Sequence, residues 1–171
     1  MRDGAIGDFS VKENCVLIDH KSDDFSKFGF LKATKVSKHA EDIIEKFNVK
    51  TPSIETSTKS LSGGNIQKLI MARELSSSPK VLLAAQPTRG VDIGAAEYIH
   101  KRLIEQRDEG PAIVVISEDL DEILALSDRV VVMFEGEIVA DLGSAECSVS
   151  ELGLLMGGVK NRATLIDSHK T

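Results

Sequence analysis

A short glycine-containing segment near the middle of the chain has the residue types that bind a phosphate group. It reads Leu61-Ser-Gly-Gly-Asn-Ile-Gln-Lys68. Two glycines let a ligand approach the backbone closely, and a helix that begins there directs unpaired N–H groups and a partial positive charge toward that ligand. The serine hydroxyl adds one more donor. The segment therefore suits the terminal phosphate of a nucleotide, although Ser-Gly-Gly before a helix is also an ordinary turn and N-cap.

Three further polar segments follow in order, and the first two come directly after short apolar runs. They are Gln86-Pro-Thr-Arg-Gly-Val-Asp92, Ser117-Glu-Asp-Leu-Asp-Glu122 and Leu126-Ser-Asp-Arg129. Asp92 precedes a helical pattern, so one role open to it is that of an N-cap. The acids of residues 118–122 lie at the start of a predicted helix, where its dipole favours them without any metal ion. The four histidines stand in no order that is typical of nucleophilic hydrolysis.

The elements that must position these segments alternate between strand and helix. Val81–Ala85 and Ala112–Ile116 are continuous apolar runs, typical of buried strands in parallel sheets. The helix after Asp92 is expected to bury Ile93, Ala96, Ile99 and Leu103. Periodicity and capping signals predict helices over about 10–19, 36–48, 63–75, 93–108, 119–126 and 148–156, and a hairpin of strands 129–134 and 137–142. This order indicates an α/β fold with a largely parallel sheet flanked by helices.

Composition excludes several classes of function. The chain has 171 residues, with 21 basic and 27 acidic side chains and a formal net charge of −6, so a nucleic-acid-binding role is not expected. Its longest apolar runs fall far short of the roughly 20 residues that a membrane-spanning helix needs. Cys15 and Cys147 form no metal-binding pattern and are expected to be reduced thiols.

In their order and spacing, the four polar segments resemble the nucleotide-binding domain of ABC transporters, from its signature motif to its C-terminal end. The resemblance covers roughly residues 8–142. Leu-Ser-Gly-Gly-Asn and Ala84-Ala-Gln-Pro-Thr-Arg-Gly-Val-Asp92 are similar to the second, degenerate ATPase half of simple-sugar and nucleoside importers. The resemblance implies an incomplete P-loop NTPase-like domain. In it, residues 1–60 would be a remnant of the helical subdomain, and residues 61–146 would form the signature helix and the C-terminal half of the ATPase core. Residues 147–171 would form a C-terminal helix and a polar tail.

The same resemblance implies which residues contact the cofactor. The signature loop would contact the γ-phosphate of an ATP molecule held by the opposite ATPase half. Asn65 stands where most family members have glutamine, and Asp92 would close the loop that crosses the interface between the two halves. The residues expected to contact ATP are Ser62, Gly63, Gly64, Asn65, Gln67 and Asp92.

Three departures from the family pattern bear on catalysis. The sequence contains no G-x-x-x-x-G-K-[ST] loop, which normally cradles the phosphates. Ala85 and Gln86 stand where the family has Asp-Glu, and neither alanine nor glutamine suits metal binding or proton abstraction at that place. Glu118 occupies the position of the switch histidine. We therefore expect no catalytic residue and no metal ligand, and neither tight ATP binding nor hydrolysis by the chain alone.

Two functional hypotheses follow from these observations. In the first, the chain is an ATP-binding component of an importer for simple sugars or nucleosides, and lends its signature loop to a composite site whose Mg²⁺ comes from the partner. Its partners would be another ABC ATPase domain and membrane permease subunits. It would be cytoplasmic and peripheral to the inner face of the cell membrane, without direct membrane insertion. In the alternative, the chain is an orphan truncated fragment with no transport or catalytic role. A stand-alone ATPase conflicts with the missing loop, Ala85 and Gln86.

Overall fold

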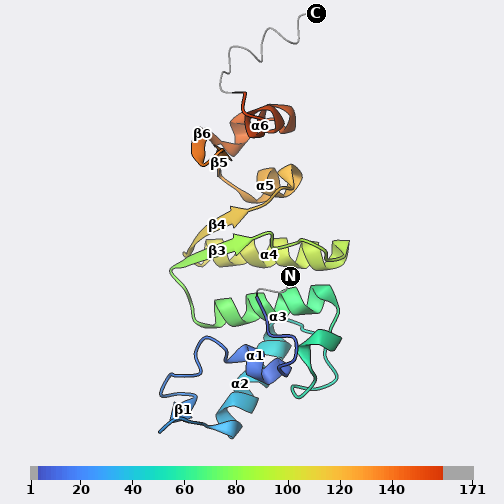
Figure 1. The fold of residues 1–171 in the computed structure, drawn as a ribbon, viewed down its shortest axis with the longest axis vertical. Helices are drawn as coiled ribbons and strands as arrows, with labels where there is room; N and C mark the ends of the chain where they lie inside the picture. Colours follow the sequence, from blue (N-terminus) through green and yellow to red (C-terminus); the bar gives the residue numbers. More distant parts are fainter. Residues whose placement is uncertain (1–3, 160–171) are drawn as a thin grey trace, which may run out of the picture. The chain divides into compact units, whose positions relative to one another are not determined.

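A computed structural model describes residues 4–159, which divide into two compact units (Figure 1). Unit 1 comprises the described residues up to Leu82 together with Pro87–Val114, and unit 2 comprises Leu83–Gln86 and the described residues from Val115 onward. The predicted division at residues 60 and 146 stays a prediction. The helices are α1 (Val11–Cys15), α2 (Ala33–Lys46), α3 (Gly63–Ser76), α4 (Ile93–Asp108), α5 (Leu120–Leu126) and α6 (Val149–Met156).

The described strands form three hydrogen-bonded pairs, and the chain has the predicted mixed α/β character. β1 (Ser26–Lys27) and β2 (Phe30–Leu31) are antiparallel, as are β5 (Arg129–Phe134) and β6 (Glu137–Gly143). β3 (Val81–Ala85) pairs with β4 (Ala112–Ile116). The last pair is parallel, because Ala112 N donates to Lys80 O at one end and Gln86 N donates to Ile116 O at the other.

The first helix begins where its sequence signal predicts. Ser10 and Glu13 form a capping box, in which the Ser10 hydroxyl accepts from Glu13 N at 3.3 Å and Ser10 N donates to Glu13 Oε2 at 2.7 Å. The bonds from Ser10 hold the pKa of the Glu13 carboxyl below its usual value. The helix ends at Cys15 and not at residue 19 as predicted, because the chain continues in turns from Val16.

A fully buried amide ties this helix to two other segments. Asn14 Oδ1 accepts from Ile6 N at 2.9 Å, and Asn14 Nδ2 donates to the carbonyl oxygens of Ile6 and Ser10 at 3.0 and 3.1 Å. The same Nδ2 lies 2.9 Å from Thr58 Oγ1, on a side chain that is itself buried. Because a buried polar group without partners is costly, this network fixes the N-terminal segment against α1 and residue 58.

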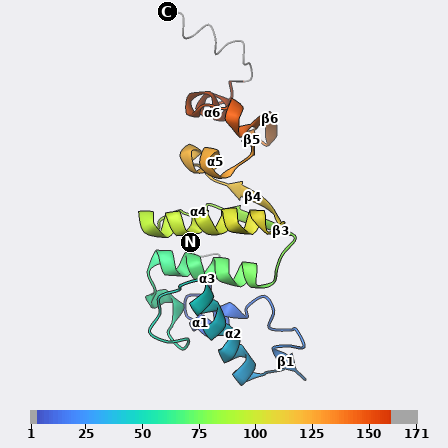
Figure 2. The same ribbon diagram turned by 180° about the vertical axis from the view of Figure 1, so that it is seen from behind.

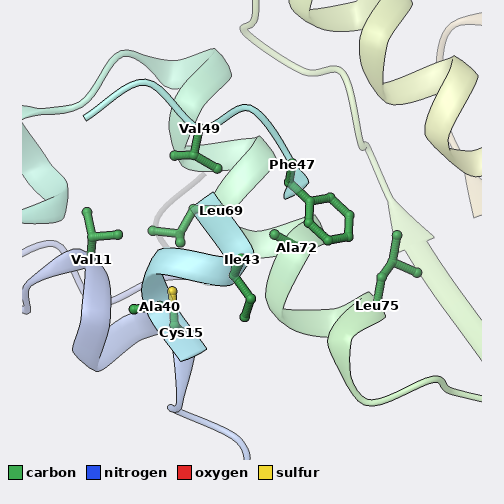
Figure 3. Close-up of a cluster of buried hydrophobic side chains, with 9 residues drawn as sticks. All are labelled: Val11, Cys15, Ala40, Ile43, Phe47, Val49, Leu69, Ala72 and Leu75. Atoms are coloured by element: carbon green, nitrogen blue, oxygen red, sulfur yellow. The ribbon is translucent and has the colours of Figure 1, made fainter. Parts of the chain in front are cut away.

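The core of unit 1 is built from α1, α2 and α3 (Figure 3). Phe47 and Val49 follow α2, and the other buried side chains of the cluster belong to the three helices. Full burial of a leucine-sized side chain contributes about 1.5–3 kcal/mol. Burial raises the pKa of the Cys15 thiol to about 12, so this cysteine is held as a neutral thiol. The buried residues of the cluster are Val11, Cys15, Ala40, Ile43, Phe47, Val49, Leu69, Ala72 and Leu75.

Helix α4 lies beside α3 in both views of unit 1 and is joined to the end of α2 by polar and aromatic contacts (Figures 1 and 2). Tyr98 Oη donates to Phe47 O at 2.7 Å, and Arg102 Nη2 donates to Lys46 O at 2.6 Å. The Arg102 guanidinium also lies 4.9 Å from the centroid of the Phe47 ring. These contacts satisfy carbonyl groups that the C-terminal end of a helix leaves unpaired.

Two predictions of burial were wrong. Ile93, expected in the core, is 80% exposed, and Ala96 is partly exposed, because Ala95, Ile99 and Leu103 form the buried side of α4. The two apolar strands were expected to be buried on both faces, but burial alternates along β3 and β4. A strand is buried on both faces only when layers cover both, and the described residues cover only one.

Unit 2 contains the predicted hairpin and two capped helices. Glu135 and Gly136 both have positive φ, 48° and 83°, which is the geometry of a two-residue hairpin turn. The Asp119 carboxylate caps α5, and the Ser148 hydroxyl caps α6. Val130 and Val132 of β5 pack with Leu152 and Leu155 of α6. Residues 160–171 of the predicted polar tail lie outside the described residues.

Candidate functional site

The N-terminal end of α3 differs from those of the other α-helices in residues 4–159 that a serine or an aspartate precedes. Ser62 is the N-cap residue, yet its side chain makes no capping hydrogen bond to the helix. By contrast, the side chains of Ser10, Asp92, Asp119 and Ser148 all accept backbone N–H bonds from the helices that they precede. Because the first N–H groups of a helix have no intrahelical acceptor, the end of α3 presents donors that its own cap does not use.

The Ser62 side chain is instead held by Asn65. Asn65 Nδ2 donates to Ser62 Oγ at 2.9 Å, which leaves the Ser62 O–H to donate outward. Asn65 Oδ1 accepts from Lys50 N at 2.8 Å. Asn65 therefore positions the serine and fixes the loop that ends at residue 50. Its sequence position predicted a cofactor contact, and the structure adds this positioning contact.

Gly64 and Asp92 lie close together where α3 meets the start of α4. A Cβ atom on Gly64 would lie 2.8 Å from Ala95 Cβ and 3.5 Å from Asp92 Oδ2. Only glycine therefore allows the two helices to approach this closely. Asp92 Oδ1 accepts from Ala95 N at 2.9 Å, which confirms the N-cap role that the sequence left open. Its role in a loop that crosses an interface stays a prediction.

We expect Asp92→Ala to lower the free energy of unfolding by about 1 kcal/mol, because it removes the cap of α4. Asp92→Asn keeps an oxygen that can accept from Ala95 N and should retain most of that stability. Chemical unfolding of the three proteins measures the difference. Equal losses in both variants would mean that the charge near the helix end, and not the hydrogen bond, is what stabilises α4.

The remaining predicted site residues lie on the first turns of α3. Gly63 is the first residue of the helix, and Gln67 follows in its second turn, where it is partly exposed. The next residue, Lys68, places its Nζ 4.4 Å from the centroid of the Tyr98 ring of α4. The structure thus brings Ser62 to Asn65 and Gly64 to Asp92. No sequence motif indicates the contact between Lys68 and Tyr98, because the two residues belong to different helices.

In unit 2, two residues that depart from the family pattern contact each other. Gln86 Nε2 donates to Glu118 Oε1 at 3.3 Å. Gln86 also has a φ of 49°, in the left-handed region that few residues other than glycine adopt. The preceding residue, Ala85, offers no side-chain oxygen. An amide and a carboxylate are therefore joined at the ends of β3 and β4.

The acidic residues that follow are explained by the start of α5. Asp119 Oδ1 accepts from Asp121 N at 3.0 Å and from Glu122 N at 3.1 Å. Between residues 4 and 159, no group of three or more His, Cys, Asp or Glu side chains is arranged to hold a metal ion.

The chain is similar in sequence to several import proteins. It is 47% identical over 157 residues to the nucleoside import ATP-binding protein NupA of Lactococcus lactis subsp. cremoris, covering 92% of this chain and 31% of that protein. It is 46% identical over 155 residues to the guanosine import ATP-binding protein NupO of Bacillus subtilis, covering 91% and 30%. It is 42% identical over 160 residues to the ribose import ATP-binding protein RbsA of Clostridium perfringens, covering 94% of this chain and 32% of that protein. The chain thus spans less than a third of each of these relatives. No family model matches it.

Solved structures show the same fold at low sequence identity. A metal-chelate type ABC transporter in an inward-facing conformation matches with a TM-score of 0.71 at 20% identity, over 88% of this chain and 59% of that one. The dimeric ATP-binding cassette MJ0796, bound to ADP and Pi after hydrolysis, matches with a TM-score of 0.64 at 22% identity, over 82% and 59%.

Proposed function

Because this chain belongs to the ATP-binding cassette ATPases and these 171 residues span part of their domain, we propose that it acts within an importer of nucleosides or simple sugars. In this proposal its Ser62-Gly63-Gly64 loop completes an ATP site on a second ATPase domain. The solute class follows the names of the relatives, which import nucleosides, guanosine, ribose and glucose.

The open N-terminal end of α3 is the observation that carries this proposal. Its first N–H groups are not capped by Ser62, and the Ser62 O–H is oriented by Asn65 without being consumed as a donor. Gly63 and Gly64 add no side chain that would keep an anion away. Convergent N–H and O–H donors at a helix N-terminus, together with the helix dipole, favour a phosphate group.

The proposal divides the chemistry between two polypeptide segments. The 171 residues contain no phosphate-cradling Gly-Lys sequence, and the end of β3 carries Ala85 and Gln86. We therefore assign the loop that cradles the phosphates, the Mg²⁺ ion and the activation of water to the partner ATPase domain. This chain supplies donors to the terminal phosphate, which stabilise negative charge there.

The proposed place of action is at a membrane, in complex with permease subunits. None of the helices in residues 4–159 is long and apolar enough to cross a bilayer. We assign any membrane-spanning role to the permease partners and place this chain at the inner face of the membrane.

Affinity capture of the tagged chain from solubilised membranes of its own cells tests the assembly. We expect a second ATP-binding cassette protein and a permease to be recovered in fixed proportion, and uptake of a nucleoside or simple sugar to fall when the gene is deleted. Purified alone, the chain should show neither micromolar ATP affinity nor Mg²⁺-dependent turnover. Unchanged uptake together with recovery of the chain alone would support the orphan-fragment hypothesis, and turnover by the pure chain would contradict the division of chemistry.

A further inference from the structure

The β1–β2 hairpin of unit 1 carries its most exposed aromatic side chains. Phe28 is 90% exposed and Phe30 is 80% exposed, and Leu31 beside them is exposed as well. Both views show the hairpin at the margin of unit 1, immediately before α2 (Figures 1 and 2). Scattered exposed apolar residues are common, but two phenylalanines and a leucine within four residues form a contiguous apolar tip.

Phe28, at the turn of this tip, has a backbone conformation that is unfavourable for a phenylalanine. The turn has two central residues, Phe28 with a φ of 52° and Gly29 with a φ of 83°, between the paired residues Lys27 and Phe30. Turns of this type favour asparagine followed by glycine, and a bulky side chain at positive φ is unfavourable. The sequence therefore places a phenylalanine where it is disfavoured both by backbone geometry and by exposure to water. Strain of this kind is characteristic of functional positions.

The base of the hairpin is firmly held, so the tip is presented in a fixed position. The Phe25 ring packs against the His39 ring of α2, with centroids 4.7 Å apart. Lys32 N donates to Phe25 O at 2.8 Å, and Ser26 N donates to Ser22 O at 2.9 Å. An anchored turn loses less conformational entropy when it binds than a flexible loop would.

The hairpin and the start of α2 carry several lysines and no acidic residue, in contrast to the net negative charge of the whole chain. Residues 25–38 contain four lysines and no acidic residue. Lys27 lies over the Phe28 ring, with its Nζ 5.5 Å from the centroid. Acidic residues lie just before this segment: Lys35 Nζ is 4.0 Å from Asp24 Oδ1, and Lys32 Nζ donates to the Asp23 carbonyl oxygen. The lysines are Lys27, Lys32, Lys35 and Lys38.

We propose that this hairpin is an interfacial contact with an anionic lipid surface, in which Phe28 and Phe30 enter the headgroup region and the lysines contact lipid phosphates. Phenylalanine side chains insert at the boundary between headgroups and acyl chains, and basic residues nearby are attracted to anionic lipid. Three apolar side chains on one turn are too few for a stable protein interface, which buries about 800 Å² on each partner. A bilayer needs no such matching surface. The contact is shallow, does not span the bilayer, and is independent of the proposed transport role.

A tryptophan reporter tests the contact directly, because the chain contains no tryptophan of its own. Phe30→Trp is mixed, as the full chain, with vesicles of phosphatidylcholine containing phosphatidylserine and with vesicles of phosphatidylcholine alone. We expect the emission to shift to shorter wavelength and to be quenched by brominated acyl chains with the anionic vesicles only. An unchanged emission would overturn the proposal, and equal shifts with both vesicles would overturn the role of the lysines.

Vesicle co-sedimentation of unlabelled proteins separates the aromatic and basic contributions. Phe28→Ser with Phe30→Ser should lower binding by about tenfold or more, as should replacement of the four lysines by glutamine. Ile138→Ser, at an exposed apolar residue of β6, and Lys80→Gln are the matched controls and should bind as the parent does. Circular dichroism verifies that each variant is folded. A blue shift of the Phe30→Trp protein on concentration without vesicles would identify a second copy of the chain as the occupant and overturn the lipid assignment.

Discussion

Replacing Ser62 by arginine is expected to lower ATP turnover and solute uptake by the assembled importer by about a hundredfold or more. Ser62 is exposed at the uncapped end of α3, so a long side chain there fills the space that the terminal phosphate would occupy. It also covers the backbone donors of the first helical turn. Ser62→Ala removes only the hydroxyl donor and should cost about tenfold, a smaller loss than that of a whole set of donors. Uptake of radiolabelled solute into proteoliposomes, with ATP hydrolysis measured in parallel, gives both values.

Ser77→Arg is the matched control for this prediction. Ser77 is an exposed serine at the opposite end of the same helix, where it is the C-cap residue. A positive charge there is compatible with the helix dipole, so activity should be unchanged. Both arginine variants should unfold within about 0.5 kcal/mol of the parent, as expected for exposed positions. Full activity of the Ser62→Arg protein would mean that the segment is a turn and nothing more.

Replacing Asn14 by alanine is expected to destabilise the chain by about 3 kcal/mol or more. The variant leaves Ile6 N without its acceptor, removes three donated bonds, and opens a void beside Thr58 in the buried region of α1. Urea unfolding followed by circular dichroism measures the loss. Glu41→Ala on the exposed side of α2 is the control and should change stability by less than about 0.5 kcal/mol.

Asn14→Asp separates hydrogen bonding from volume. The aspartate keeps an acceptor for Ile6 N but replaces the donating nitrogen by oxygen, and burial raises the pKa of such a carboxyl above its unfolded value. The folded state then binds the proton more tightly than the unfolded state does, so stability is regained as the pH falls through the raised pKa. We expect a larger deficit relative to the parent at pH 8 than at pH 5. A deficit that does not change with pH would show that the carboxyl is not desolvated.

Local signals in the sequence predicted most of the elements. The Ser10–Glu13 spacing gave the start of α1, the Ser-Gly-Gly turn gave the start of α3, and Glu135-Gly136 gave the turn between β5 and β6. Each of these signals depends on residues within a few positions of one another, where backbone geometry decides the outcome. Their positions could therefore be predicted without knowledge of the tertiary structure.

The contacts that organise the core and the site are not local, and the sequence did not reveal them. Asn14 is buried because its partners include Thr58, 44 positions away, and Asn65 holds the backbone of Lys50, 15 positions before it. Ile93 was assigned to the core by periodicity alone, but it lies on the exposed side of α4, whose buried side begins with Ala95 in the same turn. The helical period determines which residues share a face of the helix. It does not determine which of two neighbouring faces packs against the rest of the protein.

The close approach of α3 and α4 has a consequence for how this gene would drift if its protein lost its partner. Gly64 is required by packing, since a Cβ there would lie 2.8 Å from Ala95 Cβ, whether or not any anion binds nearby. Purifying selection for folding alone would thus preserve this glycine in a lineage that no longer transports anything. Ser62 is exposed and does not cap its helix, so folding places little restraint on it. Among descendants of this chain, replacement at position 62 beside an unchanged position 64 would record the loss of the ligand rather than the loss of the fold.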